Sequence, residues 1–244
     1  MNDGTFEAGY FGKLPLRGDF IQRNVDPEFI QVWDGWLQNV ITNSKEILGD
    51  QWLNYYLVSP IWRFYLPLDN DATYCGLMLP SVDKVGRYFP FAIISQVDNS
   101  IPAQTLIENN KNWFNDVEQL AMNALDESIN YDQLNLAIDS LNQTLCSVSK
   151  TAEAEPIHNF RIPLNDGMNI NQGFAQLNQM LPHAVSKRYS YWWTAGNDHI
   201  QGNLFCCDKM PDDNVYVAML DGQWQLCHMQ TLDSANNSIQ NEFI

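Results

Sequence analysis

The longest stretch of helical periodicity in the chain follows Asp26. Apolar residues then recur every three or four positions as far as Leu48, which places them on one face of a helix. Asp26 and Pro27 are favoured at the N-cap and at the first helical position, and Gly49 is a typical residue at a helix end. The pattern predicts one long amphipathic helix, in which Gly35 costs about 1 kcal/mol relative to alanine.

Other segments carry shorter signals. Residues 5–25 have the glycine-rich pattern of strands and loops, and residues 52–58 are too short a run to assign. Short apolar runs bounded by turn residues predict strands at 61–66, 74–79, 89–97, 189–194, 203–207, 215–220 and 223–229. Helical spacing predicts helices within 101–148 and at 171–181, and the polar segment 149–160 is predicted to be a connecting loop.

This order of elements predicts an α+β fold, with a mainly antiparallel central sheet and helices packed on it. The adjacent Trp192 and Trp193 would point to opposite faces of their strand, so both faces of the sheet should be covered, by helices on both sides or by a partner on one. A length of 244 residues permits one large domain or two small ones. A single domain over 1–244 is favoured, with a subdivision near residue 150 as the alternative.

The chain is strongly acidic, with a net charge of −16 from 13 basic and 29 acidic residues. This balance argues against a nucleic-acid-binding protein and against docking on an anionic membrane. It suits a partner with a basic patch, or it serves solubility alone. No segment resembles a signal peptide or a membrane span, and the odd number of cysteines has no framework spacing. These features predict a protein of the reducing cytoplasm.

Motifs for catalysis or cofactor binding are incomplete. Gly12-Lys13 lacks both the first glycine and the final hydroxyl residue of a phosphate-binding loop. A zinc site would draw on His199, Cys206, Cys207, Cys227 and His228, but neighbouring strand cysteines face opposite ways. Ser81, Cys206 or Cys227 could serve a hydrolase, although no nucleophile elbow surrounds any of them. We therefore predict no metal, no cofactor and no catalytic residue.

Two glycine-containing segments, 9–23 and 79–91, hold an unusual share of the few cations. These cations are Lys13, Arg17, Arg23, Lys84 and Arg87. Asp83 lies four residues before Arg87, so the pair either stabilises the loop or is displayed to a partner. Asp19, within Arg17-Gly18-Asp19, is expected to pair with a nearby cation in a turn. If the two segments converge, they form a basic spot on an acidic protein.

At these segments the sequence resembles the TagF family of type VI secretion-associated proteins, with matches in chain order over residues 9–195. The matching elements are Gly12-Lys13-Leu14-Pro15, Gly18-Asp19-Phe20, Arg23, Trp33-Asp34-x-Trp36-Leu37, Pro60-x-Trp62-Arg63-Phe64, Pro80-Ser81-Val82-Asp83-Lys84-Val85-Gly86-Arg87-Tyr88-Phe89-Pro90 and Tyr191-Trp192-Trp193-Thr194. The run from Pro80 through Ser81, Gly86 and Phe89 to Pro90 is the most specific of these elements.

The resemblance implies a cytoplasmic accessory protein that represses type VI secretion post-translationally by binding a forkhead-associated scaffold protein. Some family members carry a fused phosphatase domain, and this activity is not expected in a chain of this length. We predict a partner-binding surface formed by Lys13, Arg17, Asp19, Asp83 and Arg87, since exposed irregular loops often carry function. The alternatives are an uncharacterised hydrolase and a structural subunit of the secretion machine.

Overall fold

The computed structural model describes residues 7–69, 72–126, 130–141, 159–165, 167–180, 189–227, 229–233 and 238–240. The strands are β1 (Ala8–Gly12), β2 (Ile21–Arg23), β3 (Trp62–Pro67), β4 (Thr73–Leu79), β5 (Phe91–Val97), β6 (Phe160–Pro163), β7 (Tyr189–Gly196), β8 (Gln201–Asp208), β9 (Gln230–Asp233) and β10 (Ser238–Gln240). The helices are α1 (Pro27–Leu48), α2 (Trp52–Leu57), α3 (Ala103–Asn109), α4 (Lys111–Ala124), α5 (Tyr131–Leu141), α6 (Ile170–Met180) and α7 (Asp213–Asp221). Two 3₁₀ turns cover Gly49–Gln51 and Trp224–Leu226.

Within the described residues, the strands form one ten-stranded sheet in the order β10-β9-β6-β8-β7-β3-β4-β5-β1-β2. Every neighbouring pair in it is antiparallel except β6 and β9. The predicted α+β fold with a mainly antiparallel sheet is therefore confirmed. The pairing of β3 with β7 joins strands from both sides of residue 150 in this sheet, while the single-domain assignment stays a prediction.

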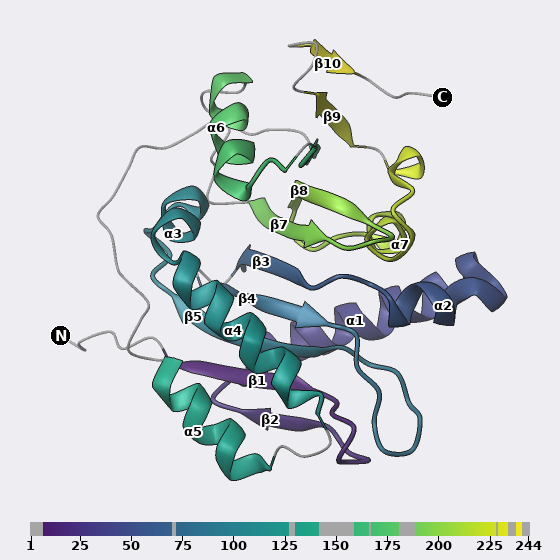
Figure 1. Ribbon diagram of the computed structural model, residues 1–244, viewed down its shortest axis with the longest axis vertical. Helices are drawn as coiled ribbons and strands as arrows, with labels where there is room; N and C mark the ends of the chain where they lie inside the picture. The colour runs from purple at the N-terminus through teal and green to yellow at the C-terminus, as the bar shows by residue number, and fades with distance from the viewer. Residues whose placement is uncertain are drawn as a thin grey trace.

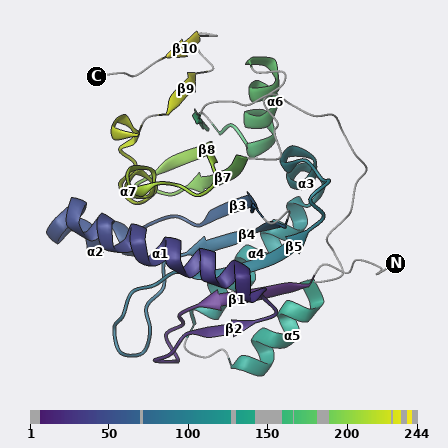
Figure 2. The same cartoon turned by 180° about the vertical axis from the view of Figure 1, so that it is seen from behind.

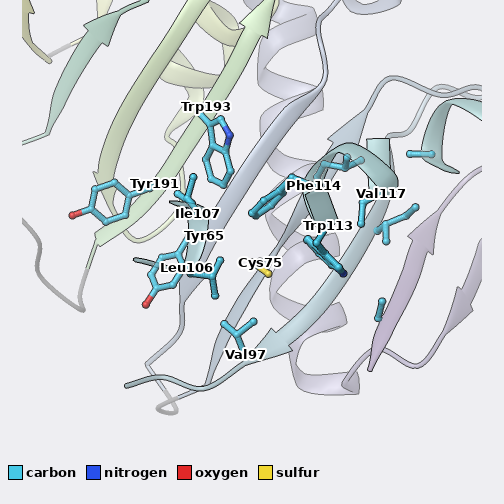
Figure 3. Close-up of a cluster of buried hydrophobic side chains, with 14 of the residues drawn as sticks. Tyr65, Cys75, Val97, Leu106, Ile107, Trp113, Phe114, Val117, Tyr191 and Trp193 are labelled. Atoms are coloured by element: carbon cyan, nitrogen blue, oxygen red, sulfur yellow. The ribbon is translucent and has the colours of Figure 1, made fainter. Parts of the chain in front are cut away.

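Helices cover both faces of the sheet, as Figures 1 and 2 show from opposite sides. Helices α3, α4, α5 and α6 contribute to one apolar cluster, and α1, α2 and α7 contribute to the other. Trp193 belongs to the first cluster and Trp192 to the second, which confirms the predicted alternation. Figure 3 shows the first cluster, in which Trp193 lies near Phe114 of α4, with their ring centroids 5.0 Å apart.

Helix α1 forms where the periodicity places it. The Asp26 carboxylate accepts the N–H of Glu28 at 2.7 Å, which caps the first turn. Trp33 and Leu37 are fully buried on the inner face, and Gly49 ends the helix at φ +52°. The helix is attached to the segment just before α7, because the Trp36 indole donates to the carbonyl oxygen of Pro211 at 2.8 Å.

Three predicted segments need correction. Residues 215–220, expected as a strand, lie in α7, whose six apolar positions are all buried; a short apolar run does not by itself distinguish a strand from a buried helix. The strand expected at 223–229 is a 3₁₀ turn, and β9 begins only at Gln230. Phe160 begins β6 instead of ending a loop, and residues 142–158, 181 and His228 lie outside the described part of the chain.

The remaining predictions of helices agree with the structure. Residues 101–148 contain α3, α4 and α5, and the short helix expected at 171–181 is α6. The unassigned run 52–58 contains the one-and-a-half-turn helix α2. Among the helices that the structure describes, none is both long and apolar enough to cross a membrane.

Candidate functional site

The two glycine-containing segments meet at one end of the sheet. The antiparallel pairing of β1 with β5 places Gly12 opposite Phe91. The β1–β2 loop (residues 13–20) and the β4–β5 loop (residues 80–90) therefore leave the sheet together, and Figure 1 shows the second as a long excursion. We call these two loops the loop tip.

Asp83 is the centre of the loop tip. Its Oδ2 accepts hydrogen bonds from Lys13 Nζ and Arg87 Nε, each at 2.6 Å. Its Oδ1 accepts the backbone N–H groups of Val85 at 3.0 Å and Arg87 at 2.8 Å. A carboxylate on a protruding loop is thus saturated by donors from both loops, which joins them into one unit.

These donors determine the ionisation of Asp83. Burial alone would raise the pKa of the Asp83 carboxyl, but the hydrogen bonds from Lys13 and Arg87, with that from the Val85 N–H, hold the pKa well below its usual range. The Asp83 side chain is fully buried, whereas that of Arg87 is 58% exposed. The ion pair with Lys13 is consequently a buried one, and the pair with Arg87 extends to the surface.

Backbone contacts add to this junction. The Lys84 N–H donates to the carbonyl oxygen of Arg17 at 3.1 Å, and the Arg87 guanidinium donates to the carbonyl oxygen of Gly18. Ser81 Oγ donates to the carbonyl oxygen of Lys13 at 2.7 Å. Each of these three contacts ends on a main-chain carbonyl oxygen of the β1–β2 loop, so the conformations of the two loops depend on each other.

The loop tip is also tied to α2 and to an aromatic cluster. The Tyr56 hydroxyl of α2 donates to the carbonyl oxygen of Ser81 at 2.9 Å and accepts its N–H at 3.0 Å. Phe20 stacks on Phe11 and contacts Phe89 edge-on, with centroids 5.4 and 4.8 Å away. These contacts connect the tip to the core, so it is a preformed surface.

The outer side of the loop tip is cationic and partly apolar. Arg17, Lys84 and Arg87 are exposed there, together with Val85 at 67% and Phe20 at 44% exposure. The Arg17 guanidinium lies 4.9 Å from the ring centroid of Tyr131 in α5, which restrains its position. Such a combination of fixed cations and exposed apolar side chains is suited to binding a protein.

The five predicted contact residues thus divide into two groups. Arg17, Asp19 and Arg87 are exposed, whereas Lys13 and Asp83 are only 5% and 4% exposed. Lys13 and Asp83 therefore shape the loops from beneath the surface, and partner binding itself stays a prediction. Within the described part of the chain, Asp19 forms no ion pair, so its expected pairing with a cation was wrong.

Other residues of the family signature serve the fold. Arg23 of β2 donates to Asp139 Oδ1 at 2.8 Å and to the carbonyl oxygen of Asn135 at 2.9 Å, which fastens α5 to the sheet edge. Trp33, Trp62, Trp192 and Trp193 are buried in the two apolar clusters, and Trp36 packs at the edge of one of them. Structural roles therefore explain the presence of these residues in the family signature, and no catalytic role is needed to explain them.

The sequence analysis did not include the exposed Phe20, Lys84 and Val85 in its predicted contact surface. It also did not identify Tyr56 and Tyr131, which contact the loop tip. One local signal was available: Val85 is an apolar residue in a turn between Lys84 and Gly86, which suggests a side chain exposed at the surface. The two tyrosines lie on α2 and α5, so their roles depend on tertiary structure.

The cysteines that the structure describes are poorly suited to act as nucleophiles. Burial raises the pKa of the Cys75, Cys206 and Cys207 thiols well above its usual range, and that of Cys227 to about 12, which disfavours the nucleophilic thiolate. In the residues that the structure describes, no three His, Cys, Asp or Glu side chains group as metal ligands.

Comparisons with known proteins support the resemblance seen in the sequence. A family model described as the TagF N-terminal domain, type VI secretion system-associated, matches residues 9–141, which is more than half of the chain. The crystal structure of PA0076 from Pseudomonas aeruginosa PAO1 is similar, with a TM-score of 0.69 and 28% sequence identity, over 89% of this chain and 95% of that one. No curated protein matches the chain.

Proposed function

Because this chain belongs to the TagF family, whose N-terminal domain is type VI secretion system-associated, we propose that it is a non-catalytic repressor of that system. In this proposal it acts in the cytoplasm and after translation, by binding a forkhead-associated scaffold protein. Scaffold held in this complex is unavailable for assembly of the secretion machine, so repression follows from mass action.

The observation that carries the proposal is the Asp83-centred junction of the two loops. Asp83 is saturated by Lys13, Arg87 and two backbone N–H groups, so the loops are ordered before any partner arrives. A preordered surface avoids the entropy cost of ordering on binding and thereby gains affinity. The family signature is densest in this part of the chain.

The charge of the loop tip indicates the partner surface that suits it. The chain carries a net charge of −16, yet the exposed charged residues of the tip include Arg17, Lys84 and Arg87. An acidic patch on the scaffold would match the tip, while the rest of the protein would repel it. This arrangement favours one binding orientation.

Reversing the charge of the loop tip tests the proposal. In the Arg17→Glu/Lys84→Glu variant, we expect the affinity for the purified forkhead-associated scaffold to fall by more than about tenfold, since like charges at a contact cost several kcal/mol. Isothermal titration calorimetry measures this loss, and the melting temperature of the variant should stay close to that of the wild type.

Lys111→Glu is the matched control, because Lys111 is exposed at the start of α4, outside the loop tip. It should bind the scaffold as the wild type does. Equal weakening by Lys111→Glu would indicate a general charge effect. Undiminished binding by the double variant would remove the loop tip from the interface, and absence of any complex with the wild type would contradict the repressor mechanism.

A further inference from the structure

The other half of the sheet carries a pocket at the end of α7. A pocket of about 300 Å³ is lined there by Arg161, Gln201, Asn203, Asp221, Trp224 and neighbouring residues. Strands β7, β3, β4 and β5 separate β6 and β8 from β1, so this pocket is independent of the loop tip and of the function proposed for it.

Strand alternation brings the polar side chains to one face. Phe160 and Ile162 on β6 belong to the first apolar cluster, as does Leu204 on β8. Arg161 and Asn203 therefore project from the opposite face, toward α7 and the turn that holds Trp224. The register of β6 with β8 places Arg161 opposite Phe205 and Pro163 opposite Asn203, so Arg161 and Asn203 are diagonal neighbours on the same face of the two strands.

Asn203 is the unusual residue of the pocket. It is 1% exposed, and its Oδ1 has no hydrogen-bond partner among the residues that the structure describes. A buried acceptor without a donor is unfavourable, and such a group in a native protein requires an explanation. A ligand that donates an N–H group to this oxygen would supply one.

Arg161 provides a fixed positive charge. Its guanidinium carbon lies 5.5 Å from the ring centroid of Trp224, and its Nη2 donates to Thr231 Oγ1 at 3.2 Å. Stacking on the indole and this hydrogen bond limit the rotamers of a long side chain. The guanidinium is the side-chain group best suited to a carboxylate.

Asp221 provides the opposite charge at the end of α7. Its Oδ1 accepts the backbone N–H of Gln223 at 2.8 Å. Burial raises the pKa of the Asp221 carboxyl, an effect that this hydrogen bond partly offsets. An ammonium group placed beside Asp221 would stabilise the carboxylate and would lower that pKa again.

We propose that this pocket binds a small zwitterion, an amino acid or a short peptide, with its carboxylate on Arg161 and its ammonium group between Asp221 and Asn203 Oδ1. Arg161 donates hydrogen bonds and therefore requires an acceptor on the ligand. The carboxylate of Asp221 and the amide oxygen of Asn203 accept hydrogen bonds and therefore require a donor. The pocket volume lies at the lower end of the range found for small-molecule sites, which limits the ligand to a small one.

Glycylglycine is the first probe, and its binding can be followed by the indole N–H signal of Trp224 in NMR titrations of the full chain. Saturable binding is expected. N-acetylglycine lacks the ammonium group and glycinamide lacks the carboxylate, and each should bind about tenfold more weakly or worse. Failure of glycylglycine to saturate the signal would overturn the proposal, and so would binding of N-acetylglycine or glycinamide as tight as that of glycylglycine.

Variants then test the assigned residues. Arg161→Gln and Asn203→Leu should each weaken glycylglycine binding about tenfold or more. Asn123→Leu is the matched control, because Asn123 lines a hollow of about 290 Å³ between α4 and α5, and it should bind as the wild type does. Asn203→Leu removes a buried acceptor without a partner, so its melting temperature should not fall. Wild-type affinity for glycylglycine in both pocket variants would contradict the assignment. If Asn203→Leu fails to fold, wild-type affinity in Arg161→Gln alone would contradict it.

Discussion

The Asp83→Ala variant is expected to lose about 3 kcal/mol of unfolding free energy, because the substitution leaves the Lys13 ammonium buried without its counter-ion. Lys13 is 5% exposed and its Nζ lies 2.6 Å from Asp83 Oδ2. We place the loss at the lower end of the range for breaking a buried ion pair, since Arg87, the other partner, is exposed. Urea denaturation of the purified chain measures it.

Two control variants make this expectation specific. Asp19→Ala removes an exposed carboxylate from the same loop tip and should change the unfolding free energy by less than about 0.5 kcal/mol. Lys13→Met should cost less than Asp83→Ala, because Asp83 would keep its hydrogen bonds from Arg87 and from the Val85 N–H. If Lys13→Met cost as much as Asp83→Ala, the buried charge of Lys13 would not be the cause.

The pH dependence of stability provides an independent test of the contribution of Asp83. The hydrogen bonds from Lys13 and Arg87 outweigh burial and lower the pKa of this carboxyl in the folded state, so folding favours its ionised form. Its contribution to stability is therefore complete above the unfolded-state pKa near 4 and is lost as the pH falls below that value. The stability difference between wild type and Asp83→Asn should shrink between about pH 5 and pH 2. A difference that stays constant over this range would contradict the assignment.

The sequence predicted local structure best where periodicity, capping and side-chain type agreed. The helix after Asp26 is an example, because its cap, its apolar stripe and its terminal glycine all indicate the same element. Residues 215–220 carried only an apolar run, and α7 is apolar on all sides because it is buried against the sheet and α1. Without a polar face, neither a period of 2 nor one of 3.6 can be read from such a run.

For the candidate site, the sequence predicted several of the residues but not their arrangement in space. The clustering of Lys13, Arg17, Lys84 and Arg87 in two segments was visible in the sequence. Their convergence depends on β1 adding to the sheet beside β5, and nothing local specifies that pairing. The sequence left open whether Asp83 stabilises its loop or is exposed to a partner. The answer depends on its burial, and its contact with Lys13, 70 residues earlier in the chain, could not be predicted from local sequence.

The pairing that creates the site also makes Gly12 intolerant of any side chain. Gly12 has φ +138°, and a Cβ atom there would lie 2.2 Å from the carbonyl oxygen of Pro90 and 2.8 Å from Phe91 Cα. Both obstacles are backbone atoms, one at the end of the β4–β5 loop and one at the start of β5, so they can yield only if β1 and β5 separate. Backbone strain alone costs about 1–3 kcal/mol at such a conformation, and the clash adds to it.

We therefore expect Gly12→Ala to lower the unfolding free energy by at least about 3 kcal/mol and to disorder the loop tip. Gly35→Ala is the matched control, because a Cβ atom on this exposed helical glycine meets nothing within 4 Å, and it should stabilise the protein by about 0.5–1 kcal/mol. Urea denaturation of both variants, with scaffold binding as a second readout, separates the two effects. A Gly12→Ala protein as stable as the wild type would show that the close approach of β1 to β5 is not needed, and the junction at Asp83 would then have to form without it.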